Sequence, residues 1–110
     1  MIIVTSPSIP GKRVVKALGL VRGNTVRCRH IGRDLMAFLR NLVGGEIYEY
    51  TKVIAEAREQ ALDRMTDQAE RLGANAVISA RLTTATIAQG AAELLAYGTA
   101  VLVEDEPEKA

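Results

Sequence analysis

The stretch that most constrains the fold is one long amphipathic helix, which the sequence predicts for about residues 46–72. Apolar or small side chains recur every three or four residues and therefore line one face of the helix: Ile47, Tyr50, Ile54, Ala57, Ala61, Met65, Ala69 and Leu72. No Gly or Pro interrupts the run, and Gly73 follows it, where a left-handed cap favours glycine. Because the apolar face is rich in alanine, the surface that packs on it must approach closely, as a β-sheet does.

The part of the chain before this helix predicts two strands. Residues 2–4 form a β-branched run typical of a short strand. Residues 12–28 predict a long extended strand, in which two internal glycines indicate a bend or a bulge. Two alternatives stay open within it, namely a helical turn at residues 13–18 and a hairpin turn at residues 22–25.

A shorter helix and a β-hairpin complete the predicted elements. The helix covers residues 32–43 and ends at a double glycine, and the hairpin strands cover residues 76–87 and 94–104. Strict alternation in the first hairpin strand separates two sets of side chains, Ala76, Ile78, Ala80 and Leu82 on one side and Val77, Ser79, Arg81 and Thr83 on the other. Both faces of the second hairpin strand are largely uncharged, so we expect another subunit to cover one of them.

These elements predict a single α+β domain over residues 1–104, followed by a charged, frayed tail at residues 105–110. We expect a small antiparallel sheet of three or four strands packed on the long helix, with the shorter helix beside it. Aromatic residues make up only 4% of a chain that is 48% hydrophobic. A core of Val, Ile, Leu and Ala in a domain this small, with open sheet edges, predicts a homo-oligomer.

Composition also indicates the cellular compartment that we expect for this protein. The chain has one cysteine, so an intrachain disulfide is excluded and a reducing compartment is expected. The amino terminus lacks the basic and apolar regions of a signal peptide, and no run reaches the roughly 18 apolar residues of a membrane span. We therefore expect a cytoplasmic protein that makes no membrane contact.

Charge is distributed unevenly along the sequence. Residues 1–45 contain eight Lys or Arg and one Asp, a balance of +7, whereas residues 46–110 contain six positive and twelve negative side chains, a balance of −6. We interpret this as a basic part that packs beside the acidic helix of its own or a neighbouring subunit. The alternative is nucleic-acid binding through the basic part, which we disfavour because no aromatic residues are interleaved with these arginines.

Cys28 and His30 are the candidate metal ligands. Alternation places both on one side of an extended strand, and thiolate and imidazole bind divalent transition metals such as zinc, copper or nickel. Two ligands do not complete a site, so Asp34 or the same pair from another subunit would have to contribute. A Cys–His nucleophile pair is the enzymatic alternative, but neighbouring strand positions rarely bring the two groups into contact.

Other candidate contacts for a small ligand are Arg33, Asp34 and Glu46. The segment of residues 19–23 and the strand at residues 94–101 are further places where we expect ligand contacts. No catalytic residue is assigned. An enzyme with an inter-subunit active site, drawing on His30, Asp34 and Glu46, remains the alternative to a non-catalytic binding module.

Six blocks in order resemble the YbjQ-like family, which is uncharacterised and labelled putative heavy-metal-binding: residues 5–12 (TSPSIPGK), 18–23 (LGLVRG), 32–34 (GRD), 43–46 (VGGE), 72–78 (LGANAVI) and 97–101 (YGTAV). The resemblance spans about residues 2–103. It implies an α+β fold similar to the dodecin subunit, assembled as a ring that is commonly a homopentamer. It carries no metal-ligand motif onto Cys28 and His30. The resulting hypothesis is a non-catalytic homopentamer that binds a metal or a small anionic ligand.

Overall fold

The computed structural model describes residues 1–28, 48–88 and 91–107. In this part the chain forms β1 (Ile2–Ile3), β2 (Lys12–Cys28), α2 (Tyr48–Arg71), β3 (Ala76–Ala88) and β4 (Ala91–Asp105). The long helix, the long strand and the hairpin strands are thus confirmed, with small shifts at their ends. β2 is one continuous strand, so the alternatives of a helical turn or a hairpin turn within it are wrong. The predicted helix at residues 32–43 lies outside the described residues.

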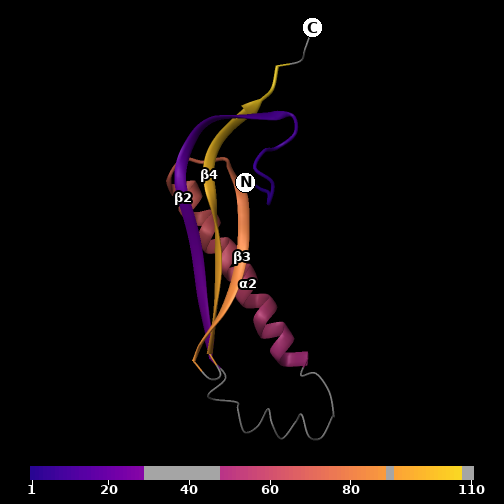
Figure 1. The fold of residues 1–110 in the computed structure, drawn as a ribbon, viewed down its shortest axis with the longest axis vertical. Helices are drawn as coiled ribbons and strands as arrows, with labels where there is room; N and C mark the ends of the chain where they lie inside the picture. Colours follow the sequence, from indigo (N-terminus) through magenta and orange to yellow (C-terminus); the bar gives the residue numbers. More distant parts are fainter. Residues whose placement is uncertain (29–47, 89–90, 108–110) are drawn as a thin grey trace, which may run out of the picture.

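The four strands form one sheet in the order β1-β3-β4-β2 (Figure 1). β4 pairs antiparallel with both β2 and β3, whereas β1 pairs parallel with the start of β3, Ile2 opposite Ala76. The α+β class is confirmed, but the expected all-antiparallel sheet is wrong. The reason is that the chain leaves β1 at one edge of the sheet and crosses to the opposite edge before β2 begins, and strand order of this kind depends on long-range pairing.

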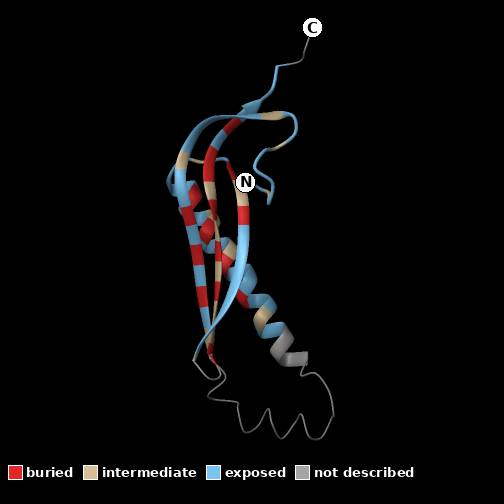
Figure 2. Ribbon diagram, in the orientation of Figure 1, coloured by how far each residue is buried: buried red, intermediate tan, exposed pale blue. Residues whose placement is uncertain are grey.

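α2 packs across one face of the sheet, mainly against β2 and β4. Its alanines at 57, 61 and 69 and Met65 are fully buried (Figure 2). The closest approach is at Gly23 of β2, where an added Cβ would lie 2.2 Å from the Ala61 carbonyl oxygen. Only glycine fits there, so the prediction that the alanine-rich face packs closely on a sheet is confirmed.

Bulges interrupt the regular alternation of β2 and β3. The register of β2 against β4 shifts between Val14 and Lys16 and between Ala17 and Gly19. The register of β3 shifts between Ile78 and Arg81, and Ser79 within this bulge has a positive φ of 53°. The strict alternation predicted for residues 76–83 is therefore wrong, because one extra residue reverses the side on which each following side chain lies.

The chain is long and narrow. Its radius of gyration is 18.5 Å, compared with about 13 Å for a compact domain of this length. Within the described residues, β1 covers the start of the outer edge of β3, and beyond it the N–H groups of Ser79 and Ala80 donate to the carbonyl oxygens of Ser6 and Val4. From Leu82 to Ala88 this edge pairs with none of the residues that the structure describes.

Candidate functional site

Most of the sequence-predicted contact residues lie outside the described residues: His30, Arg33, Asp34 and Glu46. Of Cys28 only the backbone is described, at the end of β2 opposite Ala91. Their assignment as metal or ligand contacts stays a prediction. Within the described ranges, no group of three or more His, Cys, Asp or Glu side chains lies close enough to hold a metal ion.

The other two predicted contact segments are neighbours in the structure. Residues 19–23 of β2 pair with residues 96–100 of β4, from Gly19 opposite Ala100 to Gly23 opposite Ala96. Ala96 and Ala100 pack in the core under α2, so the alternate side chains of β4 lie on the other side of the sheet, which we call the open face. This face is our candidate site.

At the centre of the open face, Tyr97 lies between two arginines. The register places Arg22 of β2 opposite Tyr97 on one side and Arg81 of β3 opposite it on the other. Tyr97 is half-buried and both arginines are exposed. Because neighbouring strands are about 4.8 Å apart, the two arginine backbones are separated by roughly 10 Å.

Local hydrogen bonds hold both arginines. Nη1 of Arg81 donates to the carbonyl oxygens of Thr5 and Ala80, at 2.7 and 2.9 Å. The backbone N–H of Arg22 donates to Oε1 of Gln68 on α2 at 2.7 Å, which fixes the strand while leaving the side chain exposed. Arginines opposite Tyr97 on both neighbouring strands offer planar hydrogen-bond donors for an anion, and the tyrosine ring offers a surface for stacking.

Helix side chains also cover the outer edge of β2. Besides the Gln68 contact, Nη1 of Arg64 donates to the carbonyl oxygen of Asn24 at 2.5 Å, and Arg27 donates to Oε1 of Gln60. The contacts at Arg22 and Asn24 satisfy backbone groups that an edge strand otherwise presents to solvent. Among the residues that the structure describes, the sheet is therefore partly protected at the β2 edge and open along the second half of β3.

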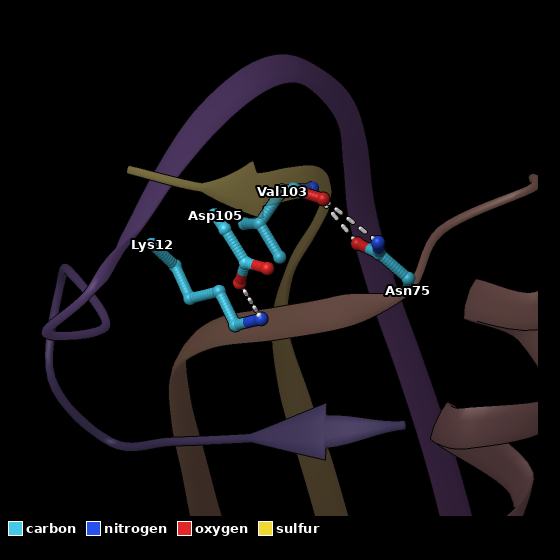
Figure 3. A network of polar contacts seen from close by, with 4 residues as sticks. All are labelled: Lys12, Asn75, Val103 and Asp105. Carbon is cyan, nitrogen blue, oxygen red and sulfur yellow. Dashed lines mark hydrogen bonds and ion pairs between the residues drawn. The ribbon is translucent and has the colours of Figure 1, made fainter. Parts of the chain in front are cut away.

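The polar contacts at the far end of the sheet are structural. Asn75 forms two hydrogen bonds with the backbone of Val103, and Lys12 forms an ion pair with Asp105 (Figure 3). A hydrogen bond from the Lys12 ammonium, together with its positive charge, lowers the pKa of the exposed Asp105 carboxyl. Both pairs join strand ends and leave no group in a reactive setting.

Two further features carry no chemistry. A shallow hollow follows the first half of α2 and is lined by exposed or solvent-facing helix side chains, Lys52, Ala55, Glu56, Glu59 and Gln60. α2 is not apolar enough over its length to cross a membrane. Of Arg22, Tyr97 and Arg81, only Arg81 was missed by reasoning from the sequence, because regular alternation places it on the helix side of the sheet.

Comparison with known proteins places the chain among uncharacterised relatives. A family profile described as putative heavy-metal-binding matches residues 1–104. A UPF0145 protein of Clostridioides difficile is 54% identical over 106 residues, covering 96% of this chain and 95% of the relative. A UPF0145 protein of Pyrococcus horikoshii is 58% identical over 104 residues, covering 94% of this chain and 89% of the relative.

One solved structure shares the fold. It is a protein of unknown function of the DUF74 family from Pediococcus pentosaceus, with a TM-score of 0.63 and 14% sequence identity. The match covers 94% of this chain and 98% of the other. At this identity the likeness concerns the fold alone.

Proposed function

This chain belongs to the YbjQ family, described as putative heavy-metal-binding, and on that premise we propose that it is a non-catalytic homo-oligomeric module that binds a metal ion or a small anionic ligand. The family resemblance inferred from the six sequence blocks is thereby confirmed. The proposed assembly is a ring of five dodecin-like subunits in the cytoplasm. The observation that carries the assembly is the unpaired edge of β3.

The open part of β3 has the properties of a strand that pairs with another chain. Residues 82–88 contain no charged residue and no proline, the two features that usually protect an exposed edge. Two large apolar side chains, Leu82 and Ile87, are 45% and 55% exposed. Pairing with a second copy would bury them and satisfy the free backbone groups.

The overall shape supports the same conclusion. A radius of gyration well above that of a compact domain means that the subunit is elongated, so that it has a large surface for contact with neighbouring copies. Because α2 partly covers the β2 edge, we expect the β3 edge of one copy to meet a different surface of the next or to pair with its own counterpart. A head-to-tail contact of two different surfaces closes into a ring, and we favour this arrangement.

The metal part of the proposal rests on Cys28 and His30. Their donor atoms suit zinc, copper or nickel, and a ring would bring several copies of this incomplete pair into one assembly. Arg33, Asp34 and Glu46 remain proposed ligand contacts. The alternative function is an enzyme whose active site lies between subunits and uses His30, Asp34 and Glu46.

Native mass spectrometry tests the proposal on protein purified without chelator and without a metal-affinity tag. We expect a five-fold assembly that carries a metal ion or small molecule in fixed stoichiometry. The double variant Cys28→Ser, His30→Gln should keep the assembly and lose a bound metal, with Arg58→Gln as a surface control. A bare monomer would refute the assembly, and a bare pentamer would refute the resident ligand.

A further inference from the structure

The register of the sheet determines which residues flank Tyr97. In β2, two register shifts, between Val14 and Lys16 and between Ala17 and Gly19, each insert one residue relative to β4. Together they restore the alternation that begins at Val14, so Arg22 lies on the same face as Val14 and opposite Tyr97.

A single bulge in β3 decides which residue lies on the other side of the tyrosine. Without the register shift between Ile78 and Arg81, Ala80 would lie opposite Tyr97, and Arg81 would lie on the helix side. The bulge includes Ser79 in a left-handed conformation that residues other than glycine rarely adopt, held by its N–H bond to Ser6.

The bulge in β3 points to a functional role for this part of the open face. Bulges bend strands, and they also occur beside binding sites, where they redirect a side chain. Here the bulge moves Arg81 from the helix side of the sheet to the open face, so that Tyr97 lies between two arginines.

The chemistry of the row formed by Arg22, Tyr97 and Arg81 defines its ligand. Tyr97 is partly exposed, and an aromatic ring is suited to stacking with a planar aromatic group. Arginine binds phosphate through paired hydrogen bonds. The exposed side chain of Arg22 and the N–H groups of Arg81 other than Nη1, which bonds to Thr5 and Ala80, are the donors that this face offers to an anion.

The same face of β4 also carries an acidic side chain, Glu93. Its Oε2 accepts a hydrogen bond from Nδ2 of Asn24 at 3.4 Å. In the register of the sheet, Glu93 lies opposite Val26 and Ala85 and not opposite the two arginines.

We propose that the Arg22–Tyr97–Arg81 row binds a nucleotide, with the base stacked on Tyr97 and the phosphate held by the two arginines. This inference deepens the proposed function, on which it rests for the binding role, by naming the class of the small anionic ligand. It needs neither the metal nor a particular number of subunits.

The test is a titration of the full-length protein with a purine nucleoside monophosphate, followed in amide NMR spectra. We expect shifts centred on residues 95–99 of β4 and on Arg22 and Arg81, with weaker effects from the nucleoside or from inorganic phosphate alone. Arg22→Gln and Arg81→Gln should each weaken binding at least about tenfold, the loss of one charged hydrogen bond. Tyr97→Leu should remove the contribution of the base to the binding affinity but keep the contribution of the phosphate.

Arg58→Gln, an exposed arginine on α2, is the matched control and should bind as the wild type does. Arg22→Lys and Arg81→Lys keep the charge without the planar fork and should bind with intermediate affinity, which guards against a variant that fails to fold. Binding that ignores the row substitutions, or no binding at millimolar nucleotide, would overturn the inference. Binding of a single-stranded oligonucleotide without binding of the mononucleotide would also overturn it. Native mass spectrometry of the same samples measures the number of subunits and the bound metal independently of nucleotide binding.

Discussion

The side chain of Asn75 pairs with the backbone of Val103 in the way a neighbouring strand would. Its Nδ2 donates to the Val103 carbonyl oxygen at 2.9 Å, and the Val103 N–H donates to its Oδ1 at 2.8 Å (Figure 3). The backbone N–H of Asn75 also donates to the Val101 carbonyl oxygen at 3.2 Å. One residue therefore fixes the junction between α2 and β3 onto the end of β4.

The first prediction removes this side chain. Asn75→Ala leaves both backbone groups of the buried Val103 without their partner, so we expect a loss of about 1–3 kcal/mol in the free energy of unfolding, measured by urea denaturation. Asn24→Ala is the matched control, since its amide makes one exposed contact at 3.4 Å with Glu93. An equal effect of the two substitutions would contradict the structural role of Asn75.

A second prediction concerns the contact between helix and sheet. Gly23→Ala places a methyl group 2.2 Å from the Ala61 carbonyl oxygen and 2.4 Å from the Met65 backbone nitrogen. The helix has to move away, and we expect a loss of more than about 3 kcal/mol or failure to fold. In Gly98→Ala the nearest atom is a Val77 side-chain carbon at 2.6 Å, so the loss measured by urea denaturation should be smaller. The reverse order would show that the helix crosses β2 elsewhere.

A third prediction follows from Ser79. Because its φ of 53° is strained for a residue with a Cβ, Ser79→Gly should raise the free energy of unfolding by about 0.5–1 kcal/mol. Ser8→Gly, in the loop before β2 and without positive φ, should give no such gain. Thermal and urea unfolding of both variants check the difference.

A fourth prediction concerns how the free energy of unfolding changes at acidic pH. Lys12 lowers the pKa of Asp105 in the folded protein, so the stabilisation is present above the carboxyl's unfolded pKa and is lost as the pH falls through its folded pKa. The stability difference between wild type and Asp105→Asn should therefore be largest above about pH 5 and should shrink toward pH 3. Glu106→Gln controls for the loss of one charge nearby. Because the pair is exposed, roughly 1 M salt should reduce the difference.

The elements of the fold could be predicted because their signals are local. The spacing of alanines and Met65 along α2, and its end before Gly73, are periodic or capping signals within the segment itself. The alternation of β4 is also local, and Tyr97 lies on the predicted side together with Val101 and Val103. Where one residue's environment depends on its immediate neighbours, the sequence was sufficient.

The candidate site could be predicted only in part. Arg22 and Tyr97 lie in the two segments, residues 19–23 and 94–101, where ligand contacts are expected from the sequence, whereas the place of Arg81 depends on register between strands. One extra residue in β3 decides whether Arg81 lies beside Tyr97 or under α2. The sequence around Ser79 contains no glycine that would indicate this bulge. In β2 the two register shifts cancel, so Arg22 lies on the same face as Val14, as simple alternation predicts. The sequence-based argument against nucleic-acid binding was that no aromatic residue is interleaved with the arginines. This is true along the chain, but across the sheet Arg22 lies opposite Tyr97.

The last prediction tests whether the open edge of β3 mediates assembly. Leu82 and Leu72 are almost equally exposed, at 45% and 47%, but Leu82 lies on the unpaired edge and Leu72 follows the end of α2. A lysine at the edge should oppose strand pairing because its charge would be desolvated in the contact. Leu82→Lys should therefore shift native mass spectra and light-scattering mass toward the monomer, while Leu72→Lys keeps the wild-type assembly. Both changes are on the surface and should alter subunit stability by less than about 0.5 kcal/mol. If both variants assemble normally, the subunits meet through another surface, and the exposure of Leu82 needs a different explanation.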